Sequence, residues 1–200
     1  MPTPWRKLLY KELANIDLNG RVLDLGGSKK SGYHGLLKGE HTFDVANIDK
    51  EYGFDIELDL EQPFKIDNEM YDGVLAINVL EHIYNHENFL SESYRVMKQG
   101  GSIIIGVPFL IQVHPCPHDH WRYSKETLEK ILDKAGFKDI QVRAVGRGPF
   151  TAAFQIIYNA LFFSIFRAIV FGVASVLDSV VQRKMNKDSY PLGYLVTARK

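Results

Sequence analysis

The sequence predicts a single α/β domain built on a mostly parallel sheet with helices on both faces. From Arg21 onward, short apolar segments typical of buried strands alternate with segments typical of helices, which is the order of a doubly wound sheet. The 200 residues suffice for one domain that buries roughly 70% of its unfolded surface, and they leave no room for a second full domain. The first apolar segment runs into Gly26 and Gly27, and such a turn lets the backbone approach a ligand at the carboxyl ends of the strands.

The expected elements follow from hydrophobic periodicity and from end signals. An amphipathic helix is expected over residues 5–14. The expected strands cover residues 21–25, 42–48, 73–78, 102–108, 139–145 and 192–198. Asn85 is a suitable N-cap for a helix that runs to about residue 98 and is closed by Gly100 and Gly101. Ser124 is suited to cap a helix that ends at residue 135, before Gly136.

Residues 149–187 form an apolar helical insert before the last strand. Up to residue 181 the only charges are Arg167 and Asp178, and a cationic run follows over residues 182–187. The strands on either side belong to one sheet, so an even number of membrane crossings is needed, and two spans of about 20 residues do not fit. We expect two shorter helices, breaking near Arg167 or Gly172, that lie in a membrane interface or cover the mouth of the active site. A buried helical pair or a homodimer contact fits the pattern equally well.

Composition limits the compartment and the partners. The 24 basic and 24 acidic residues cancel, and the short basic cluster after the insert suits anionic lipid better than a nucleic acid, so no nucleic-acid partner is expected. The single Cys116 and an amino terminus without the apolar run of a signal peptide favour a cytoplasmic protein, with the inner face of the membrane as the alternative location.

Carboxylates follow the first strands at the same edge of the predicted sheet. Asp24 ends the first strand before Gly26, Gly27 and Ser28, and Asp49 closes the second strand. A carboxylate at the second position can accept both hydroxyl protons of an adenosine ribose. Asp59, ten residues later, is placed to accept an adenine amine. An ordinary strand-end aspartate at 49 and a loop-capping aspartate at 59 are the competing interpretations.

A resemblance to a known family rests on motifs spread over most of the chain. They are Val22-Leu-Asp-Leu-Gly-Gly-Ser28, Asn47-Ile-Asp49, Asp59-Leu60, Tyr71-Asp-Gly-Val-Leu-Ala-Ile-Asn-Val-Leu-Glu-His-Ile83, Arg95-Val-Met-Lys-Gln-Gly-Gly101, Ala135-Gly-Phe137 and the final Gly193-Tyr-Leu-Val-Thr-Ala-Arg-Lys200. Together they resemble class I S-adenosylmethionine-dependent methyltransferases of the type 11 kind. The resemblance implies a Rossmann-like, doubly wound sheet of about seven strands, mostly parallel with an antiparallel last strand.

The same resemblance implies S-adenosyl-L-methionine as the cofactor and roles for the residues that match. Gly26 and neighbouring backbone would line the methionine portion, Asp49 the ribose and Asp59 the adenine, with Asn78 close to the sulfonium. The family usually has Asp/Glu-x-Gly-x-Gly-x-Gly at the first turn, whereas Ser28 and Lys30 occupy the second and third glycine positions here. Pro108-Phe109 and the run His118-Asp-His-Trp-Arg-Tyr-Ser124 are similar to a subgroup associated with glycan and cell-envelope biosynthesis, which also carries an apolar insert.

The histidine-rich loop after the expected strand at residues 102–108 supplies the candidate catalytic groups. An imidazole with a pKa near 6.5 is suited to take a proton from a hydroxyl acceptor at neutral pH. We expect His118 or His120 to act as the general base, with Asp119 orienting it. In the alternative, Asp119 pairs with Arg122 to hold the loop and both histidines are structural.

Metal binding by this loop is not expected. The metal-ligating residue types present are His114, Cys116, His118 and His120. Pro115 and Pro117 prevent a helical face, and the spacing matches no common zinc module.

The function predicted from the sequence is methylation, at oxygen, of a glycan, lipid-linked or other small-molecule acceptor. A nicotinamide-dependent oxidoreductase would need Gly-x-Gly-x-x-Gly, which the first turn lacks. The remaining alternative is a membrane-associated binding or scaffold protein whose nucleotide-binding fold is not catalytic.

Overall fold

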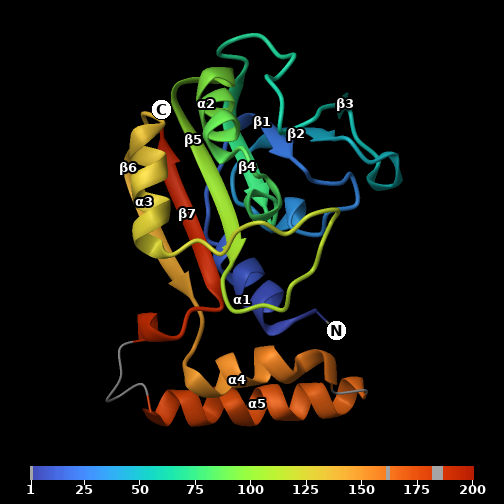
Figure 1. Ribbon diagram of the computed structural model, residues 1–200, viewed down its shortest axis with the longest axis vertical. Helices are drawn as coiled ribbons and strands as arrows, with labels where there is room; N and C mark the ends of the chain where they lie inside the picture. The colour runs from blue at the N-terminus through green and yellow to red at the C-terminus, as the bar shows by residue number, and fades with distance from the viewer. Residues whose placement is uncertain (1, 161–162, 182–186) are drawn as a thin grey trace.

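One seven-stranded sheet organises the molecule, with strand order β3-β2-β1-β4-β5-β7-β6 (Figure 1). The computed structural model describes residues 2–160, 163–181 and 187–200. The strands are β1 Gly20–Leu25, β2 His41–Asn47, β3 Ile56–Glu57, β4 Tyr71–Ile77, β5 Met97–Pro108, β6 Lys138–Val145 and β7 Gly193–Arg199. The first five pair in parallel, and β7 lies antiparallel to both β5 and β6. The predicted sheet, mostly parallel with an antiparallel last strand, is confirmed.

Helices cover both faces of the sheet. The α-helices are α1 Pro4–Leu13, α2 His86–Val96, α3 Lys125–Lys134, α4 Pro149–Ile157 and α5 Ser164–Val181. Short 3-10 turns lie at η1 His34–Leu36, η2 Lys50–Tyr52, η3 Leu80–His82, η4 Tyr158–Ala160 and η5 Lys187–Ser189. Helices α2 and α3 pack on one apolar core, and α1 and α4 pack on the other. Successive residues of β4 alternate between the two cores, as they must in a sheet buried on both faces.

The helix caps lie where the sequence predicts them. The side chain of Asn85 accepts from the backbone N–H of Asn88, and Ser124 accepts from Thr127. Helix α2, however, ends at Val96, because Met97 already pairs with Tyr71 as the first residue of β5. The glycines expected to close the helix therefore lie inside the strand. A Cβ at Gly101 would lie 3.0 Å from the Asp72 carbonyl oxygen, so the strand needs a glycine where it passes this neighbour.

The apolar insert forms two helices, but the predicted break is misplaced. Helix α5 continues through Arg167 and Gly172, and helix α4 already ends at Ile157. Gly172 costs helix stability without breaking the helix. The Arg167 guanidinium lies 4.5 Å from the centre of the Tyr158 ring, beyond the end of α4, and so joins the two helices.

A buried acid fixes helix α4 against helix α5. Asp178 of α5 is fully buried and accepts from the backbone N–H groups of Phe150 and Thr151, both at 2.9 Å. It satisfies N–H groups that the first turn of a helix leaves without partners. The two helices lie side by side at one end of the molecule (Figure 1). The amide of Asn159, just after α4, donates to Gln112, so the insert contacts the loop that leaves β5 at the carboxyl edge of the sheet.

Candidate active site

The glycine turn after β1 packs so tightly that no side chain fits on it. Gly26 has a φ of +72°, and a Cβ there would lie 2.7 Å from a methyl carbon of Val79. A Cβ on Gly27 would lie 1.9 Å from a carboxylate oxygen of Asp24. The turn therefore presents bare backbone beyond the end of β1. This geometry fits the cofactor that the sequence motifs imply, because backbone of this kind allows a ligand to approach closely.

Asp24 supports this turn from inside the protein. Its side chain is fully buried, and its Oδ2 atom is 2.9 Å from the Tyr33 hydroxyl, which donates, and 2.7 Å from Nε2 of His34. Burial raises the pKa of the Asp24 carboxyl, while the hydrogen bond from His34 acts in the opposite direction. These contacts assign Asp24 a supporting role under Gly27. Direct contact of Asp24 or Gly27 with the cofactor stays a prediction.

Ser28 uses both its hydroxyl and its amide within the loop. The hydroxyl donates to the Tyr52 carbonyl oxygen at 2.5 Å and accepts from the backbone N–H of Lys30, while the Ser28 N–H donates to the Ser31 hydroxyl. A serine at a position where the family usually has glycine thus ties the first loop to η2. Contact between Ser28 and the cofactor remains a prediction.

Asn47, the last residue of β2, joins the loop that follows β1 to the loop that follows β2. Its buried amide nitrogen donates to the Gly27 carbonyl oxygen at 2.8 Å, and its Oδ1 accepts from the N–H groups of Ile48 and Asp49. Sequence reasoning missed this residue. The Asn-Ile-Asp pattern at a strand end is the signal that could have found it, because Asn at such a position bonds the backbone two residues on.

Asp49 and Asp59 are both exposed and both cap turns. Asp49 accepts from the N–H of Glu51, and Asp59 accepts from the N–H of Glu61. Asp49 lies two residues after the end of β2, and β2 pairs with β1, the strand that leads into the glycine turn. Asp59 follows the short β3 at the outer edge of the same sheet. The roles of Asp49 toward ribose and Asp59 toward adenine stay predictions.

Asn78 follows β4 and lines a cavity of about 340 Å³. It has a φ of +56°, and its Oδ1 accepts from the Trp5 indole N–H at 2.7 Å. The Trp5 backbone N–H donates in turn to Gln155 of α4. The cavity is lined by Thr3, Trp5, Arg6, Asn78, Ile111, Gln112, Val113, His114, Gln155, Tyr158 and Asn159. The amino-terminal helix, the loop after β5 and the apolar insert therefore build it together, which sequence reasoning did not anticipate.

The prediction that Asp119 orients His118 or His120 is wrong. The Asp119 carboxylate accepts from both terminal nitrogens of Arg122, at 2.5 and 2.7 Å, and from the backbone N–H of His114. The Arg122 guanidinium holds the pKa of Asp119 well below its usual range. The alternative, an Asp119–Arg122 pair that holds the loop, is what the structure contains.

His118 and His120 are exposed, and their rings lie 5.4 Å apart. Their backbone groups fasten the loop over η3, because the His118 carbonyl oxygen is 2.5 Å from Nδ1 of His82 and the His120 N–H donates to the Glu81 carbonyl oxygen. The histidine among the residues that line the cavity is His114. A base role for His118 or His120 stays a prediction.

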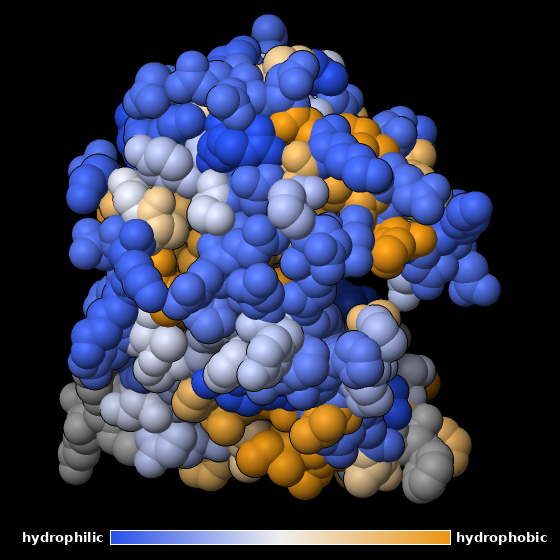
Figure 2. All heavy atoms as spheres, turned by 45° about the horizontal axis from the view of Figure 1, so that its top comes forward, coloured by the Kyte–Doolittle hydropathy of each residue, from blue (hydrophilic) through white to orange (hydrophobic). Residues whose placement is uncertain are grey.

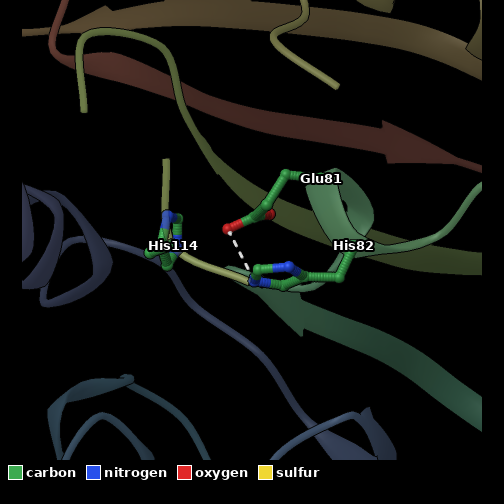
Figure 3. Close-up of side chains that lie close together, drawn as sticks. All are labelled: Glu81, His82 and His114. Atoms are coloured by element: carbon green, nitrogen blue, oxygen red, sulfur yellow. Dashed lines mark ion pairs between the residues drawn. The ribbon is translucent and has the colours of Figure 1, made fainter. Parts of the chain in front are cut away.

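Three groups converge beside the cavity, and sequence reasoning had singled out only His114 among them. Glu81 and His82 lie on η3 directly after β4, and His114 lies on the loop after β5 (Figure 3). Glu81 is fully buried, and burial raises the pKa of its carboxyl to about 8. The position of Glu81-His82 after the β4 motif was a usable signal, but a sequence does not say that a residue 32 positions away comes close to them.

The amino-terminal half of the chain matches a known protein family. Residues 5–105 match the model of a family described as "Methyltransferase domain". A rat protein, "Ubiquinone biosynthesis O-methyltransferase, mitochondrial", is 30% identical over 109 residues, which is 46% of this chain and 32% of the rat protein. The match thus spans about a third of that relative's length.

Solved structures share the fold at low sequence identity. An S-adenosylmethionine-dependent methyltransferase from Mesorhizobium loti superposes with a TM-score of 0.62 at 14% identity, covering 98% of this chain and 97% of that one. Phosphoethanolamine N-methyltransferase 2 from Haemonchus contortus, in complex with S-adenosyl-L-methionine, gives a TM-score of 0.57 at 16% identity, covering 98% of this chain and 52% of that one.

Proposed function

This chain belongs to the methyltransferase domain family and takes S-adenosyl-L-methionine as its cofactor, and from that premise we propose that it methylates a hydroxyl group of a glycan, lipid-linked or other small acceptor at a membrane surface. The observation that carries the proposal is the cavity beside Asn78. It lies at the carboxyl edge of the sheet, and its walls include both the histidine loop and the apolar insert.

The cofactor seat in this proposal uses the ends of three neighbouring strands. When bound, S-adenosylmethionine supplies an electrophilic methyl group on a sulfonium. Asp49 would hold the ribose hydroxyls, the backbone at Gly26 would receive the methionine portion, and Asn78 would lie near the sulfonium. The Trp5 indole fixes the Asn78 amide, so this polar group is already oriented at the cavity wall. Such preorganisation aligns a reacting centre without reordering at the moment of transfer.

The acceptor in this proposal occupies the cavity. The Asn78, Gln112 and Asn159 amides offer hydrogen bonds to a polyhydroxylated molecule, while Ile111 and Tyr158 offer apolar contact. Methyl transfer forms an oxygen–carbon bond as the carbon–sulfur bond breaks, and the hydroxyl proton must pass to a base. His118 and His120 at the loop remain the candidates for that base. The rat relative is named as an O-methyltransferase, which supports an oxygen acceptor.

The outer face of the insert supports a membrane location. Helix α5 buries only Phe171, Ala174 and Asp178. Large apolar side chains of α5 are exposed along its other sides: Ile165, Phe166, Ile169, Val173, Val176, Leu177 and Val180. We call this set the α5 apolar face. Apolar residues gather at that end of the molecule (Figure 2). A water-facing surface of this kind marks a contact with lipid or with protein.

Topology favours a helix pair that lies in the interface over one that crosses the bilayer. The 18-residue helix α5 is long and apolar enough to span a membrane by length and composition. However, β6 and β7 pair in one sheet, so a crossing by α5 would need a return crossing. Helix α4 has nine residues and a length of about 14 Å, against a hydrocarbon core about 30 Å thick. The cationic sequence of residues 182–187 directly after α5 favours anionic lipid over a second protein copy. These features support the proposed location at a membrane surface, for which the sequence favours the inner face.

Transfer of a labelled methyl group tests the reaction. The protein is incubated with methyl-labelled S-adenosylmethionine and separately with the polar, glycan and lipid fractions of a cell extract, and labelled products are identified by mass spectrometry. We expect label on a hydroxyl oxygen of a lipid-soluble or glycan fraction, and its loss in Asp49→Ala but not in Asp67→Ala, a matched change at another exposed aspartate. Label on nitrogen, or equal transfer by both variants, would contradict the proposal.

Thermal shift separates the enzyme from its two rivals. A rise in melting temperature with S-adenosylhomocysteine but not with NAD supports the methyltransferase. A rise with NAD alone supports the oxidoreductase, and no response to either supports the scaffold.

Liposome pelleting tests the location. We expect the protein to sediment with anionic vesicles, and the variant Ile165→Ser/Ile169→Ser/Val173→Ser to stay in solution. Met70→Ser, a matched loss of an exposed apolar side chain on another surface, should pellet like the wild type. A wild-type protein that does not pellet, and whose dimer is broken by the triple variant, would identify the α5 apolar face as a contact between two copies.

A further inference from the structure

Glu81, His82 and His114 bring three metal-ligating side chains together. One ligand atom from each lies within 4.8 Å of the other two, and the three side chains converge from two elements (Figure 3). The Oε1 atom of Glu81 is 3.7 Å from Nε2 of His82, and the rings of His82 and His114 lie 5.1 Å apart. Within the described ranges, the other loop residues considered for a metal, Cys116, His118 and His120, do not join the group.

The Nδ1 atom of each imidazole lies against a backbone carbonyl oxygen. Nδ1 of His82 is 2.5 Å from the His118 carbonyl oxygen, and Nδ1 of His114 is 3.1 Å from the Gln112 carbonyl oxygen. A carbonyl can only accept, so each Nδ1 carries a proton, and in the neutral imidazole Nε2 then has the free lone pair. Metal-binding histidines are fixed by outer hydrogen bonds of this kind, which set both the tautomer and the ring orientation.

The buried carboxyl group of Glu81 is a second, independent indication that the cluster binds a ligand. Its side chain is fully buried, and neither carboxylate oxygen has a hydrogen-bond partner among the described residues. The nearby Arg122 gives its terminal nitrogens to Asp119 and the Trp121 carbonyl oxygen. A buried carboxyl group without a partner is costly in either protonation state, and buried charges are normally paired or bound to a metal. A cation between Glu81 and the two histidines removes that cost.

We propose that Glu81, His82 and His114 form a binding site for a divalent transition-metal ion of the zinc class. Two imidazoles and one carboxylate are a ligand set that zinc enzymes use, with a further coordination position left open. Bonds of about 2.0–2.2 Å place tetrahedral ligand atoms roughly 3.3 Å apart, so the cluster must contract by about 1 Å on binding. His114 provides this movement, since its loop is at the surface and its side chain is 40% exposed.

His114 also lines the cavity beside Asn78, so a metal ion at this site would lie next to the proposed acceptor. A bound cation polarises an oxygen that coordinates it and lowers the pKa of a hydroxyl group. The metal would therefore help the acceptor hydroxyl release its proton to a base of the loop before its oxygen attacks the methyl carbon. This role rests on the proposed hydroxyl acceptor, whereas the binding of the metal does not.

Metal binding by the untagged full-length protein tests the site. The protein is stripped with a chelator, dialysed and titrated with Zn²⁺ by calorimetry, and with Co²⁺ by visible absorption, which reports the coordination geometry. We expect one ion per chain, at least a 100-fold weaker affinity in His114→Ala and in Glu81→Gln, and a loss of the cobalt absorption bands in both. His41→Ala is the matched control and should bind like the wild type. His41 is the first residue of β2 and lies at the amino end of this strand, whereas the proposed metal site lies beyond the carboxyl ends of the strands.

The outcomes separate this site from the proposed function. Absence of stoichiometric Zn²⁺ and Co²⁺ binding, or equal weakening by His41→Ala and His114→Ala, overturns the metal site. If Glu81→Gln does not fold, His114→Ala decides, because its change lies on a surface loop. S-adenosylhomocysteine is titrated into the same metal-free sample. Binding of S-adenosylhomocysteine without any metal binding leaves the methyltransferase proposal standing while refuting the metal.

Discussion

Removing one hydroxyl group, in Tyr33→Phe, tests whether Asp24 supports the glycine turn. The Tyr33 hydroxyl donates to a fully buried carboxylate, and its ring is 6% exposed. Phenylalanine keeps the ring and its packing, so the change removes the hydrogen bond without opening a large cavity. A hydrogen bond to a charged group contributes about 1.5–3 kcal/mol. At roughly 2–4 °C per kcal/mol for a domain of this size, the melting temperature should fall by about 3–12 °C.

The same variant should weaken cofactor binding, because Gly27 rests directly on Asp24. Urea unfolding gives the free energy, and calorimetry with S-adenosylhomocysteine gives the affinity. Tyr84→Phe is the matched control, since its side chain is 66% exposed, and it should change stability by less than about 0.5 kcal/mol. A Tyr33→Phe protein as stable as Tyr84→Phe would refute the support assigned to Asp24.

Three further changes probe the elements around the cavity. Gly193→Ala places a Cβ 2.5 Å from the Trp5 ring, so urea unfolding should show a loss of about 1–3 kcal/mol, and wild-type stability would contradict this packing. Asp178→Ala removes the cap of α4 and should cost about 0.5–2 kcal/mol, seen as faster proteolysis within residues 149–160; an unchanged cleavage rate would argue against the cap. Arg122→Ala leaves the Asp119 carboxylate with the His114 backbone N–H but without its ion-pair partner, so calorimetric melting should report a loss of about 1.5–3 kcal/mol, whereas a loss below about 0.5 kcal/mol would show that the pair is dispensable.

The architecture was predictable because it depends on local sequence patterns. Strand alternation between two buried faces and the caps at Asn85 and Ser124 depend on residues close in sequence, and they placed most elements within a few residues. The break inside the insert was not predictable in this way. Gly172 is tolerated within α5, where a Cβ would meet only open space, and the Asp178 cap depends on a partner 28 residues away.

The site was only partly predictable, because it depends on which loops meet over the sheet edge. The motif residues Gly26, Asp49 and Asn78 lie at the ends of adjacent strands, as expected from a parallel sheet. The bond between Trp5 and Asn78 joins residues 73 positions apart, and no periodicity encodes it. The error at Asp119 arose from assuming that neighbours in sequence are neighbours in space.

Calorimetric titration of the folded protein with S-adenosylhomocysteine decides whether the ends of β1, β2 and β4 form a cofactor seat. We expect one molecule bound per chain. In Asp49→Ala the loss of two charge-assisted hydrogen bonds to the ribose, roughly 3 kcal/mol, should weaken binding by about 100-fold. No heat of binding with the wild type, or equal affinity in the wild type and Asp49→Ala, would contradict the assignment.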